Sequence, residues 1–273
     1  MATVLERPAP VADERANGFS DAEWRTRVDL AAFYRIAAIY GFDDFLYTHI
    51  SARVPGPEHH FLINPYGLMF EEITASSLVK VDLDGNIIGE SEYGINYAGY
   101  VIHSAIHAAR EDAHWIAHFH TTAGAGVSAH SEGLLPLTQT ALYVIPRLAY
   151  HDYEGVALHL EERERLQADL GDKSIMLLRN HGTLALGSSA AEAWRGIYGL
   201  EKACAAQVAA LATGRHRVLI APEDAQEEAR RQLAGQAAKP NQDIARDSRK
   251  SHDQLTWDAV LRKVTRDRPG FDA

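Results

Sequence analysis

The chain has 273 residues, of which 46% are hydrophobic and 23% charged, as in a soluble globular protein with a substantial core. Its formal net charge of −10 argues against nucleic acid as the main partner, because phosphate binding needs a basic surface. The single cysteine, Cys204, excludes an intrachain disulfide, and no apolar run approaches the length of a membrane span. We therefore expect a cytoplasmic protein without a membrane partner.

The N-terminal half predicts an arm, one helix and several strands. Residues 1–19 carry Pro, Ala and charges without the apolar core of a signal peptide, which favours a flexible arm. Helical periodicity follows over 21–41, with Ser20 and Glu23 as a capping box. Further predicted elements are strands at 48–54 and 61–64, a hairpin over 79–88 with a Gly-containing turn, and a helix over 97–110.

The rest of the chain continues this mixture and then changes in composition. The predicted elements are strands at 114–119, 142–145, 155–158, 174–179 and 184–186, and helices at 121–130, 160–170 and 189–213. This order favours one α/β layered domain over 20–215, with mostly antiparallel strands. Residues 216–273 form a helical extension, whose apolar stripe from Trp257 to Val264 is expected to dock on the body or on a neighbouring subunit.

Three histidines point most directly to chemistry. His118 and His120 follow an apolar stretch that is typical of a buried strand, so their side chains point to the same face. His181 ends a second apolar run, where a strand meets a Gly-containing loop. Three neutral imidazoles meeting at one point would bind a divalent metal with one coordination position left open, as a catalytic site requires. A His-x-His pair alone is common in strands, so the prediction depends on the third histidine.

Other polar residues leave two readings open. His103 is either an acid/base or a histidine packed beneath the metal site, and Glu71 either enters a pocket or stays on the surface. His151 either reaches a pocket across a subunit interface or is a satisfied loop residue. Arg53 either binds a substrate carboxylate or forms a structural salt bridge, and Asn180 either orients a ligand or caps a turn.

Several long motifs of the chain resemble those of the class II aldolase/adducin family over about residues 25–213. They are YTHISAR, INPYGLMFEEITASSLVKVDLDGNI, AGYVIHSAIHAAR, HFHTTAGAGVSA, AYHDYEG and LLRNHGTLALG, and the resemblance is greatest to the adducin-like branch. It implies a three-layer α/β/α sandwich with a mainly antiparallel central sheet. It also implies a homo-oligomer, with a tetramer favoured, whose active sites lie between subunits. In the enzymes, the histidines matching His118, His120 and His181 hold the metal, usually zinc; Fe(II) and Mn are the other candidates.

The chain also departs from the aldolase pattern. Gly99 stands where the aldolases have an acidic acid/base residue, and Tyr97 and Ala98 stand where two serines bind the substrate phosphate. Two further phosphate-binding positions correspond to Tyr66-Gly67 and to His49, which are therefore substrate-binding candidates. Adducin shares the altered helix but lacks the complete triad. The retained triad therefore favours catalysis on a non-phosphorylated substrate.

Three functions are compatible with these residues. The first is a metal-dependent lyase, an aldolase or decarboxylase, acting on a small oxo- or hydroxy-carboxylic compound, in which the metal stabilises an enolate. The second is a mononuclear non-heme iron oxygenase, similar to a branch of the family in aminocoumarin antibiotic pathways that shortens an aromatic 2-oxo acid. The third is a non-catalytic, adducin-like scaffold. The sequence favours the lyase.

Overall fold

The structure of the protein is a computed structural model that describes residues 18–156, 161–238 and 250–273. The predicted N-terminal arm therefore lies almost entirely outside the described residues, as does part of the predicted strand at 155–158. Within these ranges, seven strands form one sheet, in the order β3-β2-β1-β4-β7-β6-β5. They are β1 His49–Arg53, β2 Phe61–Ile63, β3 Val79–Val81, β4 Trp115–Phe119, β5 Leu148–His151, β6 Ile175–Leu178 and β7 Gly182–Gly187. All neighbouring strands are antiparallel except β5 and β6.

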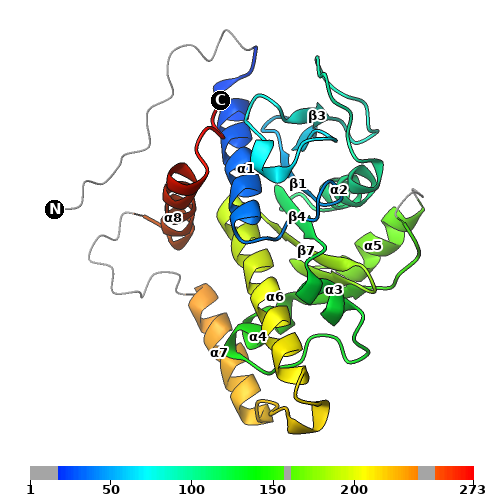
Figure 1. Cartoon of the computed structure of the whole chain (residues 1–273), viewed down its shortest axis with the longest axis vertical. Coiled ribbons are helices and arrows are strands. Elements are labelled where there is room, and N and C mark those ends of the chain that lie inside the picture. Colours follow the sequence, from blue (N-terminus) through cyan, green and yellow to red (C-terminus); the bar gives the residue numbers. More distant parts are fainter. Residues whose placement is uncertain (1–17, 157–160, 239–249) are drawn as a thin grey trace, which may run out of the picture.

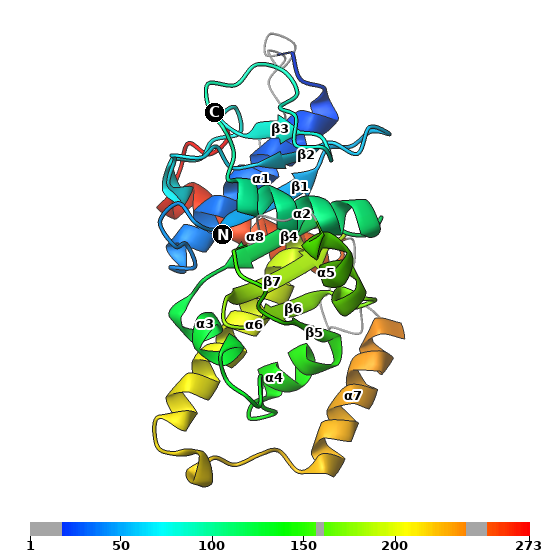
Figure 2. The ribbon, with the colours of Figure 1, turned by 90° about the vertical axis from the view of Figure 1, so that its right-hand side faces the viewer.

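Helices cover both faces of this sheet (Figures 1 and 2). The α-helices are α1 Asp21–Ile39, α2 Tyr97–Ala109, α3 Thr122–Ser128, α4 Gln139–Val144, α5 Glu162–Leu170, α6 Ala190–Leu211, α7 Glu223–Ala238 and α8 His252–Asp267. Short 3-10 helices lie at η2 Phe70–Glu72, η3 Ile145–Arg147 and η4 Arg215–Arg217. The three-layer α/β/α sandwich with a mainly antiparallel sheet is confirmed.

Alternation along the central strands produces two cores, one on each side of the sheet. Trp115, Ala117 and Phe119 of β4 pack in the core formed with α1, α6 and α8. Ile116, between them, packs in the core formed with α2 and α5. Because side chains alternate along a strand, His118 also points to the α2 side, where the functional site lies.

The C-terminal helix α8 docks on the body of the same chain. The Trp257 ring packs against Phe33 of α1 and Trp115 of β4, and its Nε1 donates a hydrogen bond to Asp29 at 2.9 Å. Beyond α8, the carbonyls of Phe271 and Ala273 accept hydrogen bonds from the backbone near η2. None of the described helices combines the length and apolar composition that a membrane crossing requires.

One short strand was predicted wrongly, and a second is not formed in the half of it that the structure describes. Residues 142–145 belong to α4 and η3, and the edge strand begins at Leu148. The Thr138 hydroxyl accepts a hydrogen bond from the backbone N–H of Ala141 and caps α4, whose Ala141 and Val144 face the core three residues apart. Short apolar runs do not distinguish a strand from a helical turn. Residues 155 and 156 form a bend, and the rest of that predicted strand lies outside the described residues.

Candidate metal centre

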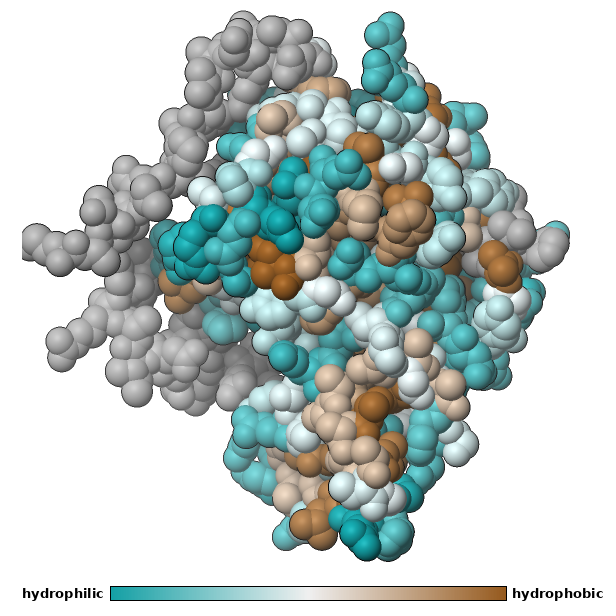
Figure 3. Space-filling model, viewed as in Figure 1, coloured by the Kyte–Doolittle hydropathy of each residue, from teal (hydrophilic) through white to brown (hydrophobic). Residues whose placement is uncertain are grey.

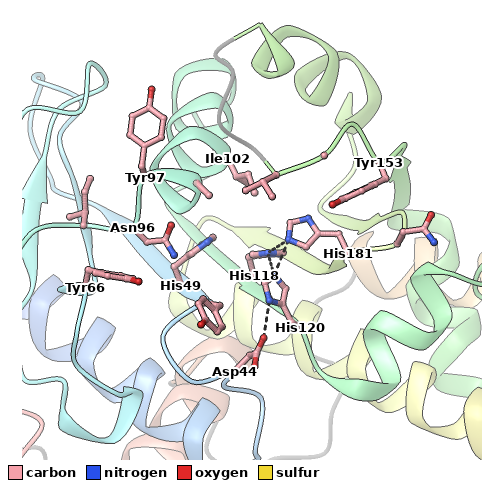
Figure 4. Close-up of a pocket in the computed structure, with 16 residues that line it drawn as sticks. Asp44, His49, Tyr66, Asn96, Tyr97, Ile102, His118, His120, Tyr153 and His181 are labelled. Carbon is pink, nitrogen blue, oxygen red and sulfur yellow. Dashed lines mark hydrogen bonds and ion pairs between the residues drawn. The ribbon is translucent and has the colours of Figure 1, made fainter.

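Three imidazoles converge on one point at the C-terminal end of the central strand β4 (Figure 4). His118 lies in β4, His120 follows that strand, and His181 lies in the turn between β6 and β7. The Nε2 atom of His118 is 2.9 Å from that of His120 and 3.2 Å from that of His181, and the remaining separation is 2.8 Å. The backbone sets the third position, because Asn180 before it has φ 54, in the left-handed region that asparagine tolerates.

Hydrogen bonds at the opposite nitrogens set the orientation of two of these rings. His118 Nδ1 lies 2.9 Å from the carbonyl oxygen of Thr183, and His120 Nδ1 lies 3.1 Å from Asp44 Oδ2. Each Nδ1 must carry the proton, because a carbonyl and a carboxylate only accept. In the neutral rings the Nε2 lone pairs then face the common point, as in metal sites with outer-shell support.

The donor set fits a divalent metal ion. Ligand nitrogens about 2.05 Å from a tetrahedral zinc are about 3.3 Å apart, slightly more than the distances here. Burial, followed by the neighbouring imidazoles, lowers the pKa of His181 to about 4 and holds that of His118 well below its ordinary value. Both rings are thus neutral near pH 7, the form that binds a metal. Among the described residues, these three form the group of His, Cys, Asp or Glu side chains placed to hold an ion.

A buried carboxyl group supports the site from α6. Glu201 is 3% exposed and contacts the hydroxyls of Thr121 and Thr183. Thr121 caps α3 directly after His120, and the Thr183 carbonyl accepts from His118, so Glu201 braces both sides of the centre. Burial raises the pKa of Glu201.

His49 occupies the space that a side chain at position 99 would need. It lies opposite His118 in the β1–β4 register, and the two rings are 5.0 Å apart. A Cβ built on Gly99 would lie 2.5 to 2.8 Å from atoms of the His49 ring. Because residue 99 is a glycine, the His49 side chain from β1 has room to lie beside the three imidazoles.

A cavity of about 670 Å³ opens beside the three imidazoles. Tyr66 and Tyr97 lie on one side of it and Tyr153 on the other (Figure 4). Its described lining residues are Asp44, Tyr47, His49, Tyr66, Ile95, Asn96, Tyr97, Ala98, Ile102, His118, His120, Tyr153, Gly155, Val156, Asn180 and His181. No lysine or arginine is among them.

A family model described as the class II aldolase and adducin N-terminal domain matches residues 28–208. The chain belongs to this family. A Caulobacter vibrioides protein with a provisional aldolase class 2 name is 59% identical over 92% of this chain and 93% of its own. Rat alpha-adducin is 47% identical over 75% of this chain, but that match covers only 28% of adducin.

Solved structures of class II aldolase relatives have the same fold. An aldolase II superfamily protein from Pseudomonas syringae is 45% identical, with a TM-score of 0.85, and the match covers 97% of this chain and all of the other. An L-fuculose 1-phosphate aldolase from Glaciozyma antarctica is 27% identical, with a TM-score of 0.73 over 96% of both chains. The predicted family resemblance is confirmed.

The other site residues predicted from the sequence lie in or next to the cavity, behind its wall, or outside it. His49, Tyr66 and Asn180 line the cavity, and Gly67 follows Tyr66 in the same turn. His103 is fully buried behind His49, with its Nε2 2.8 Å from His49 Nδ1. His151 lies beside the centre in an adjoining small cavity, with its Nδ1 2.7 Å from Asp169 Oδ2.

Two predicted residues lie outside the cavity of the single chain. Glu71 is exposed on η2, lies 3.5 Å from Arg268 and is not among the described residues that line the cavity, so its role stays a prediction. Arg53 donates hydrogen bonds to the carbonyls of His107 and Arg110 and to Glu111. These contacts occupy Arg53 within the single chain, and its role toward a substrate stays a prediction.

Sequence reasoning missed the groups that support the imidazoles. Asp44 lies in an irregular segment before β1 and carries no motif of its own. Glu201 did have a signal, since it is an acidic residue within the buried face of α6, beside Leu200 and Cys204. A charge on the apolar face of a helix indicates a partner in the core.

Proposed function

We propose that this protein is a metal-dependent carbon–carbon lyase, an aldolase or decarboxylase, for a small non-phosphorylated oxo- or hydroxy-carboxylic compound. The observation that carries the proposal is the convergence of the Nε2 atoms of His118, His120 and His181 within 3.2 Å of one another at the wall of a cavity. Three neutral ligands leave a metal its full positive charge and an open position.

In this proposal, His118, His120 and His181 hold zinc, or else Mn or Fe(II). When bound, the metal supplies Lewis-acid stabilisation of the negative charge that develops when a bond next to a carbonyl breaks. Thr183 and Asp44 hold two of the imidazoles in the binding tautomer. Asn180, Tyr66 and Tyr97 line the space for the rest of the substrate.

The cavity lining supports a non-phosphorylated substrate. A phosphate dianion is normally bound by Arg, Lys or a cluster of backbone N–H groups. The described lining contains neither cationic side chain, and Tyr97 and Ala98 occupy the start of α2. A single carboxylate, by contrast, can be neutralised by the metal itself.

A homo-oligomer, with a tetramer favoured, is part of the proposal. Tyr47, Tyr66, Tyr97, Tyr153 and Val156 are each about half or more exposed around the cavity, which favours a second copy closing it. Apolar side chains also gather over the lower part of the face in Figure 3, near the end of α6. Exposed apolar residues in and after that helix are Val208, Leu219 and Ile220.

One observation favours a second candidate function. The 47% identity to alpha-adducin over 75% of this chain supports a non-catalytic scaffold. That candidate predicts that the three imidazoles contribute to stability or assembly without turnover.

The test is metal content and turnover of protein purified without added metal or chelator, with His118→Ala as the comparison and His114→Ala as the matched control. His114 lies outside the cavity lining. The lyase proposal expects about one zinc or manganese per chain, lost only in His118→Ala, and oxygen-independent cleavage of an oxo- or hydroxy-acid. Iron with strictly oxygen-dependent turnover would establish the oxygenase instead. A folded wild-type protein without metal or turnover would establish the scaffold.

A further inference from the structure

Behind the cavity wall, three histidines and a serine form one buried chain of hydrogen-bonding groups. His49 Nδ1 lies 2.8 Å from His103 Nε2, and His103 Nδ1 lies 2.5 Å from Ser51 Oγ. Ser51 Oγ lies 2.8 Å from His107 Nε2, and His107 Nδ1 lies 2.9 Å from the carbonyl oxygen of Ala113. All four side chains are at most 2% exposed.

The far end of this chain sets its direction. The Ala113 carbonyl can only accept, so His107 Nδ1 carries the proton and its Nε2 is left as an acceptor. Ser51 therefore donates its single hydrogen to His107 and accepts from His103 Nδ1. His103 Nε2 is then an acceptor, and His49 Nδ1 must donate to it. The neutral tautomer of every ring follows from one backbone carbonyl.

The near end of the chain opens into the cavity. His49 lines the cavity, and its Nε2 has no hydrogen-bond partner among the residues that the structure describes, although this atom is not fully enclosed. This nitrogen is therefore accessible from the cavity side. At His49, the wall beside the three imidazoles thus presents a nitrogen lone pair in a fixed direction rather than an N–H group.

We propose that His49 is a specificity-determining residue whose Nε2 accepts a hydrogen bond from the ligand, so that the site selects a ligand with an O–H next to the metal position. The inference rests on the proposed function and narrows its substrate class from oxo- or hydroxy-acids to hydroxy-acids. A 2-hydroxy acid can donate to His49 while its carboxylate lies at the metal position. A 2-oxo acid presents an oxygen lone pair to the nitrogen lone pair, which is repulsive.

Ser51 provides the sharpest variant, because it controls the tautomer of His49 without touching the cavity. In Ser51→Ala, His103 Nδ1 loses its acceptor, so His103 is free to carry its proton on Nε2 and donate to His49 Nδ1. His49 Nε2 would then carry a proton and become a donor. Ser104→Ala is the matched control: Ser104 is also fully buried, and its hydroxyl donates only to the Tyr100 and Val101 carbonyls.

The binding experiment measures lactate and pyruvate affinity for zinc-loaded protein by calorimetry. The wild type and Ser104→Ala are expected to prefer lactate roughly tenfold, about the value of one hydrogen bond. Ser51→Ala is expected to bind the two acids within about twofold of each other. Equal or tighter pyruvate binding by the wild type, an undiminished preference in Ser51→Ala, or no binding of either acid would overturn the inference.

A second readout needs neither turnover nor ligand. Long-range proton–nitrogen NMR spectra of the metal-free protein are expected to show His49 protonated at Nδ1 in the wild type and at Nε2 in Ser51→Ala. A wild-type proton at His49 Nε2 overturns the inference even if the protein is a lyase. The expected tautomers and lactate preference, without cleavage of any acid, would sustain the inference while refuting the lyase.

Discussion

Replacing Asp44 tests whether the outer hydrogen bonds hold the metal centre together. Its carboxylate accepts from His120 Nδ1 at 3.1 Å, which leaves the Nε2 lone pair of that ring directed at the centre. In Asp44→Ala the ring is free to rotate or to change tautomer. The loop itself should persist, because the backbone N–H of Asp44 donates to the Thr48 hydroxyl independently of the side chain.

Loss of such a partner typically weakens metal binding 10- to 100-fold. The Asp44 side chain is 45% exposed, so solvent screens part of its effect, and we expect the lower end of that range. The zinc dissociation constant should rise roughly tenfold, or about 1.4 kcal/mol. Competition with a chelating dye at pH 7.5 measures this change directly.

Asp43→Ala is the matched control, because it removes the same charge from the neighbouring residue, which does not line the cavity. Its zinc affinity should stay within about twofold of the wild type. Equal zinc affinity in Asp44→Ala and the wild type would refute the role of the hydrogen bond. An equal loss in both variants would show that the charge acts only through its long-range field.

Three further predictions concern the surroundings of the centre. Gly99→Ala should lower the free energy of unfolding by about 1–3 kcal/mol, because its Cβ would overlap His49. Gly199→Ala in α6 is the control: its Cβ would have its nearest neighbour at 3.5 Å, so it should raise the free energy of unfolding by up to about 1 kcal/mol. Urea titrations compare the two variants. Burial lowers the His107 pKa to about 3, so this side chain takes up a proton on unfolding below about pH 6.5. The free energy of unfolding therefore decreases as the pH is lowered from 6.5. Metal-free His107→Gln should therefore have a shallower stability slope between pH 6.5 and 5, by up to about 1.4 kcal/mol per unit; an unchanged slope would contradict this. Glu201→Gln should keep both threonine contacts, and its free energy of unfolding should lie within about 0.5 kcal/mol of the wild type. In Glu201→Ala the free energy of unfolding should fall by about 2 kcal/mol. Equal thermal midpoints for Glu201→Ala and the wild type would count against the bracing role.

Much of the fold could be predicted, because its main elements carry strong local signals. Helices α1, α2 and α6 have long periodic patterns, and β4 is a continuous apolar run ending in His-x-His. The edge of the sheet could not be predicted equally well. Strand β5 follows a proline-containing 3-10 turn. Among the described strands it pairs only with the parallel strand β6, so the nearby apolar residues 142–145 were taken for the strand instead.

In the site, too, residues close in sequence could be predicted, whereas contacts between distant residues could not. His118 and His120 could be paired from sequence because residues two apart on a strand share a face. The contacts of Asp44 with His120 and of Glu201 with Thr121 join residues 76 and 80 positions apart, and no local spacing encodes them. The chain from His49 to Ala113 depends on the β1–β4 register and on α2 lying over it, which only the structure supplies.

The three imidazoles and the wall around them come from different kinds of structure. The imidazoles lie on a central strand and a tight turn of the sheet, whereas Tyr47, Tyr66 and Tyr153 come from connecting segments. Connecting segments accept substitutions and insertions more readily than a packed sheet. Evolution, or a laboratory selection, can therefore exchange the wall and leave the imidazoles in place. In a mutant library restricted to these segments, most members should still fold, and some should have new ligand preferences.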